Sequence, residues 1–179
     1  MPRLIVLNGP PGIGKSTLAR RYVEANPLAL CPEQDVVRGL LGGWLTRETD
    51  SGLLARELCL AMATTHLLAG RDVIVPQFVA LPSYLDQLAG VARAVDADHV
   101  EILLIDEPDA AETRFHARSN DPVWADHQRT AARFIEEAGG YRLQYERLLA
   151  VTGGRRMSRI QSVNGDPDST FAALLRTLR

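Results

Sequence analysis

Short runs of consecutive apolar residues alternate along this chain with longer segments in which apolar residues recur every three or four positions. The short runs are typical of strands buried on both faces, whereas the longer period is that of an amphipathic helix. The first run ends at Asn8 and Gly9, which favour a turn. The pattern predicts five strands, at residues 4–7, 28–31, 73–75, 100–106 and 157–163.

Helical periodicity fills the intervals between these strands. The expected helices cover residues 16–24, 34–41, 52–68, 83–94, 109–118, 124–138, 141–151 and a last segment from 169. Ser83 is expected to cap its helix, because a serine hydroxyl can accept a hydrogen bond from the first turn. Strands that alternate with helices predict an α/β fold, in which helices cover both faces of a parallel sheet.

Composition is that of an ordinary globular protein. The chain has 179 residues, 46% of them apolar, and a formal net charge of −2, which gives no overall attraction to nucleic acid or to an anionic membrane. No apolar run approaches the roughly 20 residues of a membrane span. Two isolated cysteines exclude a disulfide framework. We expect one domain over residues 1–179 in a soluble, cytoplasmic protein.

Residues 9–17 satisfy the phosphate-binding pattern G-x-x-x-x-G-K-[ST] in full. Glycines let such a loop fold tightly, so that its N–H groups point at phosphate oxygens, and the following helix adds the positive end of its dipole. Lys15 is expected to bridge the β- and γ-phosphates of ATP, and Ser16 to ligate Mg²⁺. The expected nucleotide-binding residues of the loop are Gly9, Gly12, Ile13, Gly14, Lys15, Ser16 and Thr17.

Lys15 is also the only lysine of the chain, since the other nineteen of its twenty basic residues are arginines. A bias in codon usage explains the excess of arginine. The one lysine stands where a compact ammonium group, rather than a planar guanidinium, fits between two phosphates.

A second polar group follows the second predicted strand, where Asp35 and Arg38 stand one helical turn apart. In open α/β sheets, ligands bind at the carboxyl ends of the strands. The Asp35 carboxylate can accept the proton of an acceptor hydroxyl, and with Ser16 it is expected to hold Mg²⁺. A helix N-cap role for Asp35 and a solvated surface position for Arg38 are the structural alternatives.

The acceptor pocket is expected between the Asp35 segment and the chain after the third predicted strand. There Trp44 and Phe78 would supply apolar contact and Gln77 a hydrogen bond, although either aromatic ring could instead pack in the core. Such a mixture suits an amphipathic small molecule and does not exclude a nucleic-acid end.

Arg114 and Arg118 lie four residues apart, and therefore on one face, of the helix predicted after the fourth strand. Arginines so placed can clamp the transferring phosphoryl group. A surface helix with Glu–Arg pairs is the alternative. His116 and His127 flank this region and are expected to be solvated.

Two other classes of triphosphate-binding protein compete with a kinase. A GTPase is excluded, because its N-K-x-D motif would need a second lysine. A motor ATPase of the AAA type would use Asp106 and Glu107 as its Walker B pair. Two features argue against the AAA-type motor. A whole predicted strand separates this pair from the phosphate-binding loop, and no segment is left for the separate helical lid domain of an AAA module.

The order of these features resembles that of the small P-loop kinases. Closest in layout are the kinase domain of polynucleotide kinase, chloramphenicol phosphotransferase, and the gluconate and shikimate kinases. The resemblance implies a three-layer P-loop fold with a five-stranded parallel sheet, in the order 2-3-1-4-5, and a helical lid. The roles that it implies are general base for Asp35, acceptor contact for Arg38, lid arginines for Arg114 and Arg118, and adenine-flanking residues for Asn164 and Asp168.

The sequence departs from this family at Gln77, where many members carry an acid, because an amide cannot act as a base. The expected function is transfer of the γ-phosphoryl group of ATP, with Mg²⁺, to a hydroxyl of a small molecule such as an antibiotic, nucleoside or sugar. Polynucleotide 5′-hydroxyl kinase and AAA-type ATPase are the alternatives.

Overall fold

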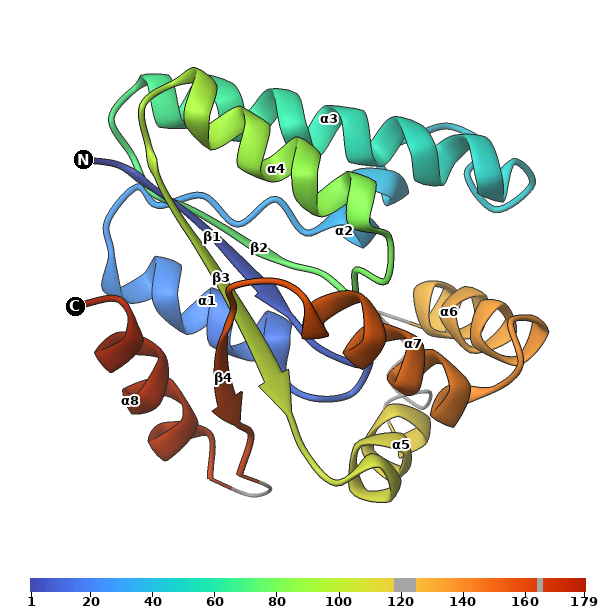
Figure 1. The fold of residues 1–179 in the computed structure, drawn as a ribbon. Helices are drawn as coiled ribbons and strands as arrows, with labels where there is room; N and C mark the ends of the chain where they lie inside the picture. The colour runs from blue at the N-terminus through green and yellow to red at the C-terminus, as the bar shows by residue number, and fades with distance from the viewer. Residues whose placement is uncertain (118–124, 164–165) are drawn as a thin grey trace.

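A computed structural model describes residues 1–117, 125–163 and 166–179. At its centre is a parallel sheet in the order β2-β1-β3-β4 (Figure 1). The strands are β1 (Arg3–Asn8), β2 (Val73–Pro76), β3 (Asp98–Ile105) and β4 (Ser158–Gln161). β1 lies between β2 and β3, so its apolar run is buried on both faces as the sequence predicts.

The sheet has four strands in the described part of the chain, and the prediction of a fifth at residues 28–31 is wrong. Only Leu30 pairs there, with Val73, in an isolated bridge. Leu28 has a left-handed φ of 65°, and Pro32 has no N–H to donate, so the pairing cannot extend in either direction. The predicted order of the remaining four strands agrees with the structure.

Helices cover both faces of the sheet (Figure 1). One face carries α1 (Lys15–Ala25) and α8 (Pro167–Thr177), and the other carries α3 (Glu48–Leu68) and α4 (Pro82–Ala94). Successive residues of β1 enter opposite cores, because side chains alternate along a strand. Within the described segments, none of the helices combines the length and the apolar character needed to cross a bilayer.

A third group of helices lies beyond the carboxyl end of β3 (Figure 1). It consists of α5 (Pro108–Ala117), α6 (Ala125–Glu137) and α7 (Tyr141–Gly153). These helices share a small core of their own, around Ala111, Phe115, Tyr141 and Tyr145. The short α2 (Gln34–Gly39) follows the Leu30 bridge on the acceptor side of the sheet.

Helix beginnings differ from the prediction at two places. The N-cap of α4 is Leu81, without a side-chain hydrogen bond, so the expected cap at Ser83 is wrong. Pro82 instead begins the helix, since it lacks the N–H that a first turn leaves unpaired. Asp35 lies inside the first turn of α2, whose N-cap is Glu33, so the N-cap alternative for Asp35 is also wrong.

Asn8, the last residue of β1, joins the phosphate-binding side of the sheet to the chain after β2. Its Oδ1 accepts hydrogen bonds from the N–H groups of Gly9 (2.8 Å) and Val79 (2.9 Å), and its Nδ2 donates to Val79 O (3.0 Å). The side chain is fully buried, so no water can replace these bonds. Asn8 therefore fixes where the loop leaves the sheet.

Replacing Asn8 by Ala is expected to lower the free energy of unfolding by roughly 3 kcal/mol, because each buried polar group left without a partner costs about 1–3 kcal/mol. Urea denaturation measures this loss. Asn26→Ala is the matched control, since Asn26 makes one hydrogen bond, to Tyr22 O, at the partly exposed end of α1. Equal losses in the two variants would contradict the role given to Asn8.

Candidate active site

The loop of residues 9–14, between β1 and α1, is held from outside through its carbonyl groups. Lys15 Nζ donates to Gly9 O and Pro10 O, at 2.9 Å each. Leu18 N, in the first turn of α1, donates to Gly14 O at 3.1 Å. These three bonds come from the residues that directly follow the loop, so they are local to the motif.

The other carbonyl groups of the loop are bound by donors far away in the sequence. Tyr141 Oη of α7 donates to Pro11 O at 2.7 Å, Arg114 Nε of α5 to Gly12 O at 3.3 Å, and Ser162 Oγ to Ile13 O at 3.1 Å. Because these carbonyls face outwards, the N–H groups of the loop can face inwards.

The inward N–H groups form an unpartnered set. Within the described part of the chain, the N–H groups of Gly12, Ile13 and Gly14 make no hydrogen bond. Gly14 is the N-cap of α1, so the helix adds the positive end of its dipole at the same point. This arrangement is suited to binding an anion, in agreement with the phosphate predicted from the sequence.

Gly12 lets α5 pack directly on this loop. Its φ is 80°, and a Cβ at this position would lie 2.7 Å from Ala111 O and from Phe115 N. No other residue fits without displacing the α5 backbone. The packing brings the helix that carries Arg114 against the loop.

A cavity of about 410 Å³ adjoins the loop. Its walls are Gly12, Ile13, Gly14, Thr17 and Leu18 on one side, and Arg114, Ala117, Ser162, Val163, Pro167 and Thr170 on the other. The volume lies within the range of about 300–1,000 Å³ that is usual for small-molecule sites. Its position beside the phosphate-binding loop suits the base and sugar of a nucleotide.

Arg114 lines this cavity and also donates a hydrogen bond to the loop. Its Nη2 donates to Asp106 Oδ2 at 2.5 Å, while its Nη1 is buried and has no hydrogen-bond partner among the described residues. A buried cationic nitrogen without an acceptor is unfavourable. The arrangement therefore favours an anionic group near Arg114, in line with the phosphate contact expected from the sequence.

Asp35 lies on α2, on the side of the sheet where the acceptor is expected. Its side chain is reachable by solvent, yet desolvation by the surrounding protein raises its pKa, while the positive charges of His127, Arg38 and Lys15 act in the opposite direction. The contribution of Lys15 means that the carboxylate lies within electrostatic reach of the phosphate-binding loop.

Arg38 is buried, which overturns the alternative of a solvated surface position. Its Nε donates to Ser51 Oγ and its Nη2 to Glu48 O, at 3.0 Å each. Its guanidinium lies over the rings of Trp44 (5.2 Å) and Phe134 (5.9 Å). Arg38 therefore organises the segment between α2 and α3 and joins it to α6.

The structure also describes the three other residues predicted to contact the acceptor. Gln77 and Phe78 follow the carboxyl end of β2, where both are half-buried and Gln77 N donates to Leu7 O at 3.2 Å. Trp44 is half-buried in the turn between α2 and α3. These positions agree with contact to an acceptor, which stays a prediction.

Three predicted residues lie outside the contacts of the cavity or outside the described residues. Asp168 is exposed at the start of α8 and pairs with Arg21 at 2.6 Å, whereas its neighbour Pro167 lines the cavity. Arg118 and Asn164 lie outside the described residues.

The donor set fits Mg²⁺ only in the company of a triphosphate. Among the described residues, no three His, Cys, Asp or Glu side chains gather as a cation site. Mg²⁺ usually takes most of its ligands from phosphate oxygens and water, with one or two from the protein. The hydroxyl of Ser16 at the loop and the carboxylate of Asp35 on α2 are hard oxygen ligands of the required kind.

Several residues of the site were not predicted as functional. Ser162 and Tyr141 carry no local signal, because their partners in the loop are 149 and 130 residues away. His127, expected to be solvated, stacks on Trp44 with ring centroids 4.4 Å apart and planes 12° apart. A polar residue at the end of an apolar strand was the available signal for Asn8.

The profile of the AAA domain family matches residues 4–143 of the chain. Because this is well over half of its length, the chain belongs to the AAA domain family.

Solved structures with less than 25% sequence identity share its fold. An APS kinase from Mycobacterium tuberculosis, in complex with AMPPNP and APS, is 18% identical with a TM-score of 0.64, covering 99% of this chain and 97% of that one. A gluconokinase from Sinorhizobium meliloti 1021 is 20% identical, with a TM-score of 0.60 and coverage of 99% and 95%. Kti12 from Chaetomium thermophilum, in complex with ADP-AlF3, is 15% identical, with a TM-score of 0.62 and coverage of 98% and 96%. The resemblance to small P-loop kinases is confirmed for the fold.

Asp35→Asn is expected to stabilise the protein at neutral pH. The folded state raises the pKa of Asp35 above its unfolded value of about 3.9. The folded protein therefore binds the carboxyl proton of Asp35 more tightly than the unfolded chain does. The free energy of unfolding then falls as the pH rises from the pKa of the unfolded chain towards that of the folded protein. Urea unfolding should show the variant to be more stable than wild type at pH 7, with the difference shrinking towards pH 4.

Asp50→Asn is the control for this prediction, because Asp50 is an exposed carboxylate that pairs with Arg47 on the surface. That change should not raise stability at either pH. Identical stabilities of wild type and Asp35→Asn at pH 7 would show that desolvation of Asp35 is unimportant.

Proposed function

We propose that this protein is an ATP-dependent phosphotransferase that moves the γ-phosphoryl group to a hydroxyl of a small molecule. The observation that carries the proposal is a loop whose Gly12, Ile13 and Gly14 N–H groups make no hydrogen bond among the described residues, with the charge of Lys15 acting on the Asp35 carboxylate. A phosphate cradle alone would serve any triphosphate-binding protein. The carboxylate beside it supplies the proton acceptor that transfer to an alcohol requires.

The nucleotide would enter with its base and sugar in the 410 Å³ cavity and its phosphates on the loop. Lys15 Nζ would exchange its bonds to Gly9 O and Pro10 O for the β- and γ-phosphate oxygens. Arg114 would direct its unpartnered Nη1 to the same anion. Mg²⁺, held by Ser16 and Asp35, would neutralise charge on the β- and γ-phosphates.

In the transfer step, the acceptor oxygen attacks the γ-phosphorus while the bond from that phosphorus to the β–γ bridging oxygen breaks. ADP leaves, and the hydroxyl proton passes to Asp35. A raised pKa makes the Asp35 carboxylate a stronger base. Loop N–H groups, Lys15 and Arg114 stabilise the charge of the transition state.

A small acceptor is supported by the surroundings of Asp35. Trp44, Gln77 and Phe78 offer a mixture of apolar and polar contact, and the net charge of −2 provides no general attraction for a polynucleotide. The names of the similar APS kinase and gluconokinase point the same way. A small molecule is therefore the proposed acceptor, and a polynucleotide 5′ end is included as one of the candidates in the acceptor experiment.

Asp35→Asn is expected to lower phosphoryl transfer by roughly 10²-fold or more, the usual scale for loss of a general base. Transfer from γ-labelled ATP is measured with a panel of nucleosides, sugars, hydroxylated antibiotics and an oligonucleotide 5′ end. Affinity for ATP, measured by calorimetry, should stay near that of wild type. Full turnover in the variant would remove Asp35 as the base.

Lys15 offers a direct test of the nucleotide site, because it is the only lysine of the chain. An amine-reactive acylating reagent should modify Lys15, and ATP should slow this modification. Mass spectrometry of the Lys15 peptide, relative to a peptide without lysine, measures its extent. Lys15→Ala should lose ATP binding. Acylation of Lys15 that ATP does not slow would contradict the assignment.

A motor ATPase makes a different prediction. It should hydrolyse ATP rapidly without an acceptor and lose this activity in Glu107→Gln, whereas a phosphotransferase should hydrolyse slowly and respond strongly to its acceptor. In the structure the Asp106 carboxylate is bonded to Arg114 and to Gln161 Nε2 (3.3 Å), while Glu107 is exposed. Rapid acceptor-free hydrolysis that depends on Glu107 would replace the proposed function.

A further inference from the structure

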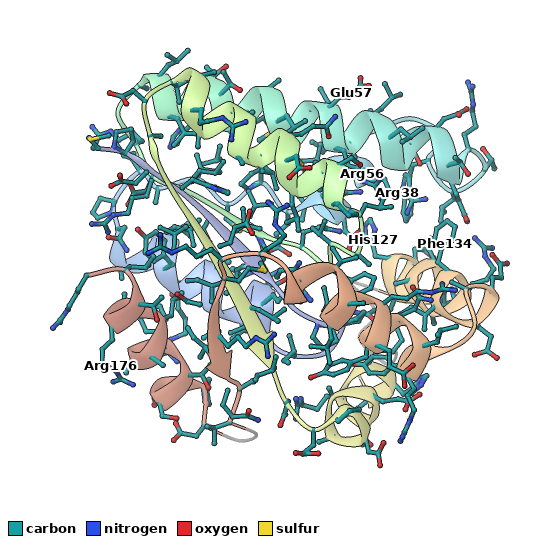
Figure 2. All side chains as sticks on the ribbon, in the orientation of Figure 1. Arg38, Arg56, Glu57, His127, Phe134 and Arg176 are labelled. Carbon is teal, nitrogen blue, oxygen red and sulfur yellow. The ribbon has the colours of Figure 1, made fainter. Side chains whose placement is uncertain are left out.

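The imidazole ring of His127 lies flat on the indole ring of Trp44. The ring centroids are 4.4 Å apart and the planes differ by 12°. His127 belongs to α6, whereas Trp44 belongs to the turn between α2 and α3, so the stack joins two parts of the molecule that are distant in sequence. Figure 2 shows His127 and Phe134 reaching from α6 towards Arg38 of α2.

Gly39, at the end of α2, forms another wall beside this imidazole. A Cβ at position 39 would lie 3.3 Å from His127 Nε2 and 3.4 Å from Cε1. Any side chain there would press on the ring. Gly39 therefore leaves room for the Nε2–Cε1 edge of the ring, and we call the space that the imidazole fills between the Trp44 face and Gly39 the slot.

The floor of this slot, the Trp44 indole, is contacted by Arg38 of α2 as well as by His127 of α6. Arg38 lies over the Trp44 indole at 5.2 Å, and Ser51 Oγ and Glu48 O hold the Arg38 guanidinium. A cation over an indole stabilises the ring where it lies. Residues of α2 and α3 thus help to hold Trp44 as an aromatic surface, and Phe134 of α6 contacts the same guanidinium.

The slot also lies within electrostatic reach of the base of the proposed reaction. The charge of His127 acts on Asp35, so the ring that fills the slot lies within electrostatic reach of the carboxylate. A hydroxyl carried by another ring in the same place would be able to approach that carboxylate. His127 thereby marks where the flat part of an acceptor fits.

We infer that the slot between Trp44 and Gly39 is the acceptor subsite for a flat aromatic or heteroaromatic ring, and that His127 fills it when no acceptor is bound. This inference rests on the proposed function, whose acceptor it narrows to ring-bearing alcohols, such as nucleosides, over open-chain or puckered sugars. The acceptor ring replaces the imidazole on Trp44, and its hydroxyl is then presented to Asp35.

Binding without ATP tests the slot. Benzyl alcohol and cyclohexylmethanol are matched probes, because both carry a primary hydroxyl on a six-carbon ring and only the first ring is flat. Ligand-observed NMR should show that the protein binds benzyl alcohol and pyridylmethanol, which are the flat probes, more tightly than cyclohexylmethanol. In His127→Ala the flat probes should bind about tenfold more tightly, which is the size of one base stack on an aromatic residue.

Two further variants keep the test falsifiable. Trp44→Leu retains apolar volume but removes the flat face, so benzyl alcohol should bind no better than cyclohexylmethanol, while ATP affinity reports that the protein is folded. His116→Ala is the control on α5, where His116 is exposed and lies near Glu112. It should leave the binding of every probe unchanged.

The outcomes separate the two proposals. Flat and saturated probes that bind alike, or a His127→Ala protein that binds flat probes no more tightly than wild type, overturn the slot. If the protein transfers phosphoryl groups to a sugar but does not bind the flat probes, the proposed function is retained and the ring-bearing acceptor class is overturned. Flat-probe binding through Trp44 without transfer to any alcohol would support the slot and overturn the proposed function.

Discussion

The hydrogen bonds to the carbonyl groups of residues 9–14 are the constraint on which the rest of the site depends. A loop that is to offer its N–H groups to phosphate must have its carbonyls satisfied elsewhere. Lys15 and Leu18 satisfy three of them locally, and Tyr141, Arg114 and Ser162 satisfy the others. The shape of a motif of a few residues is thus maintained by α5, α7 and the chain after β4.

The acceptor side is tied to the same loop by different means. Asn8 bonds both Gly9 and Val79, so the ends of β1 and β2 keep a fixed separation. The pKa of Asp35 is raised by desolvation, so its ionised form is less favourable in the folded protein than in water. The ends of β1 and β2 are linked by the buried polar contacts of Asn8.

The sequence was sufficient wherever the determining contacts are local. The run 4–7, the phosphate-binding motif and the helices around them follow from spacing and composition alone. Residues 28–31 have the composition of a strand, yet the left-handed backbone at Leu28 and the missing N–H of Pro32 stop the pairing. Whether such a segment pairs depends on its neighbours in space.

The sequence predicted the residue types of the candidate site better than it predicted the contacts that these residues make. Arg114 was expected as a clamp on phosphate, and the structure shows that it also bonds Gly12 O and Asp106. Tyr141 and Ser162 could not be found, since a side-chain bond across 130 or 149 residues leaves no periodicity in the sequence. This distance has a consequence for protein synthesis. Ser162 leaves the ribosome roughly 7–30 s after Ile13 at about 5–20 residues per second, so the nascent chain completes its first motif only when its last strand has been made.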